Sequence, residues 1–198
     1  MAEFAQIPLD KWQWHPSPLA HQVVLVTSID AEGTVDVAPK SNCTVIAFEP
    51  LTYGIGCQKD HLTYQNIAAT REFIVNVPTI DQAGVIAAMA DAPHEDRLAL
   101  TGFTTTPGKT VGVAAIDQCV AHLECALDQV VEFGSGEVFI IGAVHLIEVD
   151  ARCLVPAGTA ERYEALGTPF VFLEPGWYAP IGQPVQAQDR SPSDRHGR

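Results

Sequence analysis

Four runs of apolar and β-branched residues follow one another in the first third of the chain, with only a few residues between them. The runs cover residues 22–29, 34–38, 43–48 and 52–57. Their composition is typical of β-strands, and connections this short join antiparallel strands, because a parallel crossover takes a dozen or more residues. Asp30–Gly33 is the first turn, where Gly33 can adopt a positive φ. Pro39 has no N–H to donate, so we expect it to end the second strand.

The rest of the chain continues with strands, and helices are inserted between them. We expect strands at 72–77, 119–128 and 137–149, helices at 62–70, 80–90, 93–100 and 159–165, and a loop without periodicity at 102–112. Alternation in the strand at 119–128 predicts that Leu123, Cys125 and Leu127 face inward and that His122, Glu124 and Asp128 face outward. Gly134–Gly136 predicts a hairpin, and Gly142 predicts a bulge or bend in the long last strand.

Together these elements predict a mainly β fold, an antiparallel barrel with helical excursions. We expect a single domain over residues 1–181 and a disordered polar tail over 182–198. The sequence has neither a G-x-G-x-x-G after the first strand nor a G-x-x-x-x-G-K-[ST]. This argues against a dinucleotide-binding Rossmann domain and against a P-loop.

Charge and hydropathy exclude several classes of partner. The formal net charge is −13, from 24 acidic and 11 basic residues, so nucleic acid and anionic membrane surfaces are disfavoured. No stretch approaches 18 uninterrupted apolar residues, and the first residues lack the basic and apolar regions of a secretory signal. We therefore expect a cytoplasmic protein without a membrane span.

Cysteine, histidine and serine show no pattern that indicates a metal site or a hydrolase. The five cysteines include no C-x-x-C, and the seven histidines show no H-x-H or H-x-x-x-H spacing. A disulfide framework, a structural zinc site and any other metal site are therefore not expected. No serine lies in a G-x-S-x-G frame, which argues against a serine hydrolase.

Two polar clusters follow the ends of two predicted strands. One is the segment 38–42, and the other is the segment 57–63 together with Asn66. Lysine occurs only at positions 11, 40, 59 and 109, so each cluster holds one of four lysines. If the two strands are neighbours in one barrel, both clusters lie at the same rim.

The two clusters together predict a phosphate site without a glycine loop. Lys40 and Lys59 supply positive charge, and Thr63 lies near the start of a predicted helix, where free N–H groups and the dipole favour an anion. The alternative for each cluster alone is structural: Asp60 caps the helix and Lys40 is a solvated surface charge. No side chain stands out as nucleophile or base, so we expect no catalytic side chain and infer that a bound cofactor carries the chemistry.

The sequence resembles the flavin reductase-like domain of the FMN-binding split-barrel group, in its flavoredoxin-like branch. Three runs carry the resemblance, VLVTSIDAEGTVDVAPKS, YGIGCQKDHLTYQNIAATREFIVNVP and FIIGAVHLIEVD. The resemblance covers roughly residues 20–150 and implies an antiparallel Greek-key split barrel. It also implies a homodimer that binds FMN, or less often FAD, near the interface.

The resemblance also implies which residues contact the flavin. These are Val37, Ala38, Pro39, Lys40 and Ser41 in the first cluster, and Cys57, Lys59, Asp60, Thr63 and Asn66 in the second. Lys59 and Thr63 would hold the phosphate. Two positions depart from the family pattern: Glu137 stands where many reductase components carry a histidine, and Asp36 stands where an asparagine is common.

Two redox functions and one binding function follow from these observations. The first is an NAD(P)H-dependent flavin reductase that transfers hydride from nicotinamide to flavin. The alternative is a flavoredoxin-like protein that holds FMN tightly and exchanges electrons with a protein partner. A small-ligand binding barrel without a redox role is the third. Both NADH and NADPH are compatible with the sequence as donors, and the flavin is compatible with a prosthetic group or with a substrate.

Overall fold

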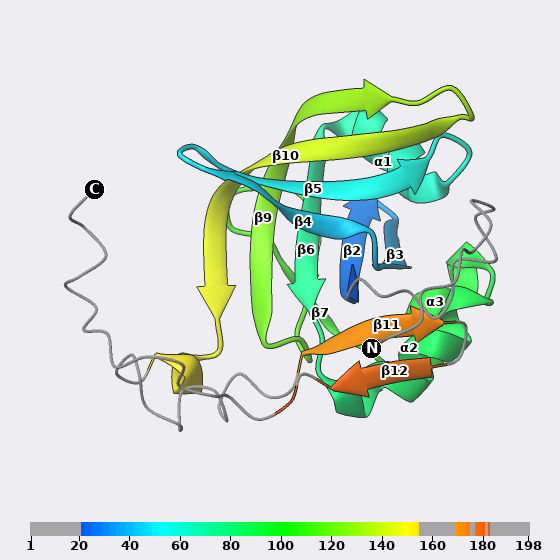
Figure 1. The fold of residues 1–198 in the computed structure, drawn as a ribbon, viewed down its shortest axis with the longest axis vertical. Coiled ribbons are helices and arrows are strands. Elements are labelled where there is room, and N and C mark those ends of the chain that lie inside the picture. The colour runs from blue at the N-terminus through cyan, green and yellow to red at the C-terminus, as the bar shows by residue number, and fades with distance from the viewer. Residues whose placement is uncertain (1–20, 155–168, 175–176, 181, 183–198) are drawn as a thin grey trace, which may run out of the picture.

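The structure is a computed structural model that describes residues 21–154, 169–174, 177–180 and 182 (Figure 1). Its main element is a seven-stranded antiparallel sheet. The strands are β2 (Val24–Ile29), β3 (Val35–Lys40), β4 (Cys43–Phe48), β5 (Leu51–Gln58), β6 (Glu72–Val77), β9 (Ala121–Glu132) and β10 (Glu137–Val149). Their order in the sheet is β3-β2-β6-β9-β10-β5-β4. The predicted mainly β, antiparallel fold is confirmed.

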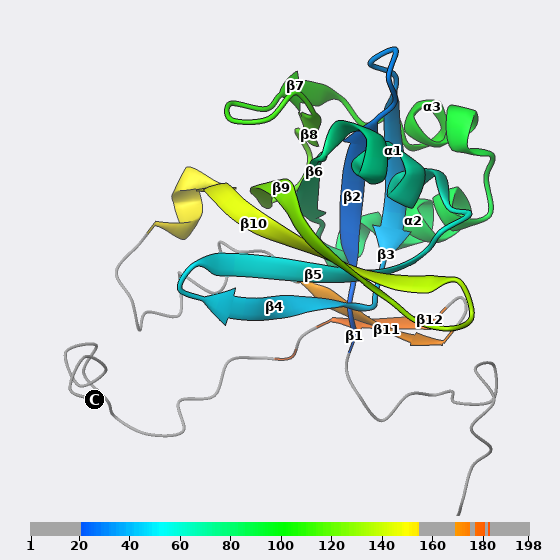
Figure 2. The same ribbon diagram turned by 90° about the horizontal axis from the view of Figure 1, so that it is seen from above.

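The sheet curls into a barrel that stays open between β3 and β4. These strands follow each other in the chain but lie at the two ends of the strand order, so they do not pair. In both views β4 and β5 cross β2 and β3 at a steep angle, so the sheet wraps around the core (Figures 1 and 2). The first polar cluster follows one edge of this opening, and the second follows β5, next to the other edge. We call this opening the split.

Two smaller sheets complete the β structure. One consists of β1 (His21–Gln22), β11 (Phe170–Glu174) and β12 (Trp177–Pro180), and the other pairs β7 (Thr105–Pro107) with β8 (Ala114–Ile116). The prediction of a plain loop at 102–112 is therefore wrong for 105–107. A strand of three residues is too short to show a period of two in the sequence. The predicted helix at 159–165 and all of the predicted tail except Gly182 lie outside the described residues.

The described helices lie at the predicted places and pack against strands of the sheet. They are α1 (Leu62–Thr70), α2 (Ala83–Ala90) after the 3₁₀ turn η1 (Ile80–Gln82), and α3 (Arg97–Thr101) after η2 (His94–Asp96), with a further 3₁₀ turn η3 (Ala151–Cys153). Helix α1 ends at Arg71, which adopts a left-handed φ of 68° and donates its N–H to Ile67. The residue at the N-cap of α1 is His61, and no side chain caps this end. Asp60 is thus not the cap that the structural alternative required.

Strand β3 runs one residue past Pro39, contrary to the prediction. Pro39 pairs with Leu25 in the register, and Lys40 pairs with Val24. The reason is topological, because β3 is an edge strand with β2 on one side only. A proline is tolerated there when its missing N–H faces away from the ladder.

The core occupies both faces of β2. Val24 and Val26 belong to the cluster inside the barrel, with Phe73 and Ile140, whereas Leu25 belongs to a second cluster under α2. The predicted irregularity at Gly142 is confirmed, since the β9–β10 register shifts between Ile141 and Gly142. A Cβ at this glycine would lie 2.7 Å from the Cε1 atom of Phe73, so the close approach excludes a side chain.

Strand β9 follows the predicted alternation with one exception. Cys125 and Leu127 are buried and Leu123 packs against the core, as predicted. Glu124 is also buried, with 1% of its surface exposed, so its predicted outward exposure is wrong. Its carboxylate accepts the backbone N–H groups of Lys109 at 2.8 Å and Thr110 at 2.6 Å. These bonds satisfy the buried charge.

Candidate functional site

The two polar clusters meet across the split. Lys40, at the end of β3, donates from Nζ to Sγ of Cys57 on β5 at 3.5 Å. Nδ1 of His61, just before α1, lies 3.8 Å from the same sulfur. The prediction assumed that the two strands are sheet neighbours, but β2, β6, β9 and β10 lie between them in the strand order. The clusters come together because Ser41 and Asn42 lead directly from β3 into β4, which pairs with β5, and the carbonyl of Asn42 accepts from the N–H of Gly56 at 2.6 Å.

A second group of polar side chains surrounds Asp36, beside the first. Thr63, in the first turn of α1, donates from Oγ1 to Oδ2 of Asp36 at 3.4 Å. Nδ1 of His94 lies 3.0 Å from Oδ1 of Asp36, and Nη1 of Arg97 lies 3.9 Å from that oxygen. Both α1 and α3 contact β3, the strand that carries Asp36, and Figure 2 shows the two helices near it. The group thus joins α1, β3 and the segment around α3.

Other predicted site residues are mostly buried and pack next to these two groups. Val37 and Ala38 are buried, and the carbonyl of Val37 accepts from Nη1 of Arg97 at 3.4 Å. Asn66, one turn after Thr63, donates to Oγ of Ser28 at 3.2 Å in a buried position. Its role here is to hold α1 against β2. Pro39 and Ser41 are partly exposed at the rim.

The side chain of Lys59 points away from these groups. Nζ of Lys59 lies 2.7 Å from Oε2 of Glu132 on β9, and both side chains are largely exposed. The hydrogen bond and the charge of Glu132 raise the pKa of Lys59. The backbone carbonyl of Asp60 accepts from Nε2 of Gln65 at 3.3 Å. The sequence placed both lysines at the phosphate site, and in this structure Lys40 is the one that contacts the rest of the cluster.

The rim of the split concentrates basic groups in an acidic chain. We call Lys40, His61, His94 and Arg97 the basic cluster. Partial burial, and then the charge of Lys40, lower the pKa of His61, and His94 and Arg97 act in the same direction. The N–H groups in the first turn of α1, the turn that holds Thr63, have no partners within the helix. This arrangement is suited to a small anion such as a phosphate monoester.

Sequence reasoning missed His94 and Arg97. They come from a 3₁₀ turn and a five-residue helix, which have no periodicity that would mark them as functional. One signal was available: the two residues are three positions apart, a spacing that places side chains on one face of a helix. Nδ1 of His94 and Nη1 of Arg97 are 2.8 Å apart.

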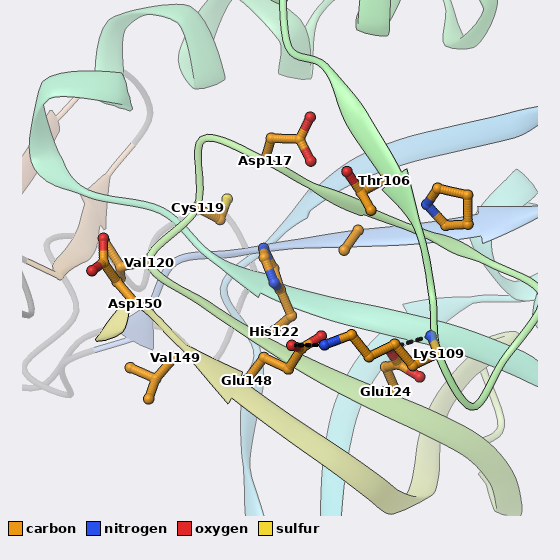
Figure 3. A pocket seen from close by; sticks show the side chains of 12 residues that line it. Thr106, Lys109, Asp117, Cys119, Val120, His122, Glu124, Glu148, Val149 and Asp150 are labelled. Carbon is orange, nitrogen blue, oxygen red and sulfur yellow. Dashed lines mark hydrogen bonds and ion pairs between the residues drawn. The ribbon is translucent and has the colours of Figure 1, made fainter. Parts of the chain in front are cut away.

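A separate pocket of about 380 Å³ lies between the β7–β8 hairpin and the first residues of β9 (Figure 3). None of its lining residues belongs to the predicted site. Its charged groups are engaged within the protein: Lys109 pairs with Glu148, and His122 donates from Nε2 to the carbonyl of Ile116 at 2.8 Å. The pocket therefore has fewer charged side chains available to bind a ligand than the rim of the split.

Within the described residues, no three His, Cys, Asp or Glu side chains are grouped in a way that could hold a metal ion. The same part of the chain contains no helix that is both long and apolar enough to cross a membrane.

Two curated relatives each match about half of the chain. A protein of Archaeoglobus fulgidus is 29% identical over 108 residues, which cover 54% of this chain and 61% of the relative. A protein of Pyrococcus abyssi is 24% identical over 97 residues, which cover 49% of this chain and 56% of the relative. The chain thus spans less than two thirds of the length of these two relatives.

Solved structures match nearly the whole chain. Nitrilotriacetate monooxygenase component B from Bacillus cereus has a TM-score of 0.81 at 21% identity, covering 94% of this chain and 100% of that one. Flavoredoxin of Desulfovibrio vulgaris (Miyazaki F) has a TM-score of 0.78 at 18% identity, covering 96% and 100%. An FMN-binding protein from Thermus thermophilus has a TM-score of 0.74 at 16% identity, covering 95% and 99%. These similarities show a shared fold.

The family assignment rests on a match to the sequence itself. The model of the Flavin reductase like domain matches residues 17–156. This range includes both polar clusters and the whole basic cluster, together with every strand of the seven-stranded sheet. The resemblance seen in the sequence is thereby confirmed. The chain belongs to the flavin reductase like domain family.

Proposed function

We propose that this protein is an FMN-binding oxidoreductase that reduces flavin with NAD(P)H. The observation that carries the proposal is the basic cluster at the rim of the split, in a chain whose net charge is −13. FMN ends in a phosphate monoester, which such a cluster and a helix N-terminus bind well. Membership of the flavin reductase like domain family supports the same ligand.

The residues present fit this cofactor. Lys40 and Arg97 would bind the phosphate as charged donors, and the backbone N–H groups in the first turn of α1, that of Thr63 included, would add further hydrogen bonds. Val37, Ala38, Pro39, Ser41 and Cys57 would line the remainder of the cofactor, and Asn66 would hold α1 in place behind them. These side chains offer both apolar and polar contacts next to the charged rim, as a flavin mononucleotide requires.

Lys59 and Asp60 complete the proposed set at the outer side of the rim. Lys59 would contact the cofactor only after its ion pair with Glu132 is broken. Surface ion pairs contribute only about 0–1 kcal/mol, so this exchange costs little. The side chain of Lys59 is 42% exposed, so it is free to reorient.

The flavin, when bound, supplies the hydride and electron transfer itself. The protein's residues bind and orient the two substrates so that the reacting groups meet, which is a positioning role rather than acid–base catalysis. No catalytic side chain is assigned. We propose FMN as the preferred flavin and FAD as the alternative, with NADH or NADPH as the electron donor.

One observation favours the flavoredoxin-like alternative. Glu137, at the start of β10, pairs in the register with Gln58, beside the second polar cluster. Where related reductase components carry a histidine, this chain thus places a carboxylate near the proposed cofactor. A negative charge there disfavours the approach of a phosphate-bearing nicotinamide dinucleotide. The alternative function is electron exchange between tightly bound FMN and a protein partner.

We also propose that the protein is a homodimer, with β4 at the interface. Strand β4 ends the sheet order, so one of its edges pairs with no other strand among the residues that the structure describes. Val45 is 39% exposed, Ile46 45% and Phe48 80%. An apolar edge strand of this kind is an aggregation hazard unless another chain covers it. A second copy of the chain would bury these side chains close to the split.

The experiment that tests the proposed function has two steps. The purified protein is first incubated with FMN and desalted, and a retained flavin absorbance is expected. The holoprotein is then mixed anaerobically with NADH and, separately, with NADPH. Bleaching of the flavin by either donor supports the reductase. Retained flavin with no bleaching supports the flavoredoxin-like alternative, and no retained or titratable flavin rules out both redox functions.

A further inference from the structure

The pocket beside the first residues of β9 has an acidic lining. Its charged lining residues are four acids and one lysine, namely Asp117, Glu124, Glu148, Asp150 and Lys109. Lys109 compensates Glu148, and Arg152, from outside the lining, compensates Asp150. The lining therefore keeps an excess of negative charge. A concave site whose charges have one sign concentrates ions of the opposite sign.

Asp117 is an acid of this lining that is open to a ligand. Its side chain is exposed, and it has no ion-pair partner in the part of the chain that the structure describes. The hydroxyls of Thr104 and Thr106 hydrogen-bond to it and lower the pKa of Asp117. Hydroxyl donors stabilise the ionised form of a carboxyl group without neutralising it. Asp117 is therefore a carboxylate that can pair with a cation.

His122 supplies a second acceptor in the pocket. Its Nε2 lies 2.8 Å from the carbonyl oxygen of Ile116. A carbonyl oxygen only accepts, so Nε2 carries the proton, and in the neutral ring Nδ1 keeps its lone pair. Nδ1 has no hydrogen-bond partner among the described residues, and the imidazole extends from β9 into the pocket (Figure 3). A ligand that binds to neutral His122 must therefore be a donor.

The rest of the lining is mostly apolar. It consists of Pro107, Ala115, Cys119, Val120 and Val149, together with Thr106. Burial raises the pKa of the Cys119 thiol to about 12, so this side chain stays neutral. Small apolar side chains next to a few acceptors suit a ligand that has an alkyl chain and a donor head group.

We propose that this pocket binds an organic ammonium ion, a primary alkylamine. Its N–H groups would donate to Asp117 and to Nδ1 of His122, and its alkyl chain would pack against the apolar part of the lining. The volume of about 380 Å³ is that of a small-molecule site. No lining residue belongs to the proposed flavin site, so this inference goes beyond the proposed function.

Three probes with the same alkyl chain and different head groups test the proposal. Butylamine, butanol and butyrate are titrated into the full chain at one salt concentration, and backbone amide chemical shifts are followed by NMR. We expect butylamine to bind with a Kd of about 1 mM, a range that a ligand of so few atoms can reach, and to shift the amides of the lining residues. Butanol should bind about tenfold more weakly, and butyrate should not bind.

Asp117→Asn tests the proposed ion pair. It should weaken butylamine binding about tenfold, the size of one charge-assisted hydrogen bond. Asp128→Asn is the matched control, since Asp128 is an exposed acid of β9 that lies outside the pocket lining. It should change the affinity by less than about twofold, because solvent and salt screen a distant charge. Equal losses in the two variants would show a response to net charge alone and would overturn the proposal.

Further outcomes are decisive. If Asp117→Asn does not fold, Glu148→Gln replaces it, because this change removes a lining charge and releases the ammonium group of Lys109 into the pocket. Unchanged butylamine affinity in Glu148→Gln would then overturn the proposal. Equal affinities for butylamine and butanol, or shifts scattered over the surface of the protein, would also overturn it. FMN binding is measured separately, so failure of either proposal leaves the other standing.

Discussion

Position 142 illustrates how a single residue sets the shape of the barrel. Gly142 lies in β10 where the register with β9 shifts, and a Cβ there would lie 2.7 Å from Cε1 of Phe73 and 3.1 Å from Cβ of Cys125. Phe73 is fully buried in the barrel core and has no room to withdraw. The missing side chain therefore allows β10 to bend closely over the core.

Gly142→Ala should lower the free energy of unfolding by about 1–3 kcal/mol, the usual cost of overpacking a core. Urea denaturation monitored by tryptophan fluorescence measures the change. Gly134→Ala is the matched control, because a Cβ at Gly134 meets nothing within 4 Å. Equal stability of Gly142→Ala and Gly134→Ala would contradict the close approach.

His61 should make the folded protein less stable below neutral pH. Partial burial and the charge of Lys40 lower its pKa in the folded state from the ordinary value of 6.5. The unfolded state therefore binds a proton first, and stability falls as the pH drops below 6.5, until the pH is below the folded-state pKa. His61→Gln should lose less stability than the wild type between pH 7.5 and pH 5.5 in urea titrations. Parallel pH profiles for the two proteins would show that His61 does not contribute.

At the scale of elements, Glu124 anchors the loop between β7 and β8. Its carboxylate accepts the backbone N–H of Lys109 and both the N–H and the hydroxyl of Thr110. Burial raises the pKa of Glu124, but these hydrogen bonds together outweigh it and lower the pKa. Gly112 donates its N–H to Oε2 of Glu72 at 2.7 Å, which gives the loop a second attachment to the sheet.

Glu124→Gln should loosen this loop, because an amide has one oxygen to accept with where the carboxylate has two. We expect faster hydrogen exchange at the amides of residues 109 and 110 and a loss of about 1–3 kcal/mol of stability. Glu148→Gln is the control, since Glu148 pairs with the exposed Lys109 side chain and not with the loop backbone. Similar exchange rates in the two variants would rule out the anchor.

Elements with a strong local pattern could be predicted from the sequence, and those set by distant partners could not. The predicted bounds of β4, α1, β6 and β10 agree with the structure, because each has a clear alternation or a clear end signal. Pro39 continues β3 because the strand lies at an edge, which depends on the whole topology. Glu124 is buried because its carboxylate accepts the backbone N–H groups of Lys109 and Thr110. These residues lie 15 and 14 positions earlier in the chain, so the alternation within the strand does not reveal them.

The same distinction holds for the site. Lys40 and Thr63 could be found because each follows a predicted element end in a lysine-poor chain. His94 and Arg97 were missed, since their three-residue spacing is a weak signal and their relevance comes from contact with Asp36, about sixty residues earlier in the chain. The direction of the Lys59 side chain depends on its ion pair with Glu132, which is the last residue of the long strand β9.

At the scale of the molecule, the proposed dimer predicts a clear effect of charge on β4. Ile46→Lys places a charge on the exposed apolar edge and should convert the dimer to a monomer, because a buried unpaired lysine is costly. Sedimentation velocity at micromolar concentration measures the state. Leu154→Lys is the control, as Leu154 is 70% exposed but lies outside the seven-stranded sheet. A wild-type monomer, or a dimer that persists in Ile46→Lys, would exclude β4 as the interface.

The split has a consequence for which part of the chain sets the width of the site. Lys40 and Cys57 face each other in space, and a short stretch of chain connects them. Ser41 and Asn42 lead from β3 directly into β4, which pairs with β5, and the carbonyl of Asn42 accepts from the N–H of Gly56 at 2.6 Å. The width of the opening at this rim is therefore set by the few residues between β3 and β4, and not by the twist of the whole sheet.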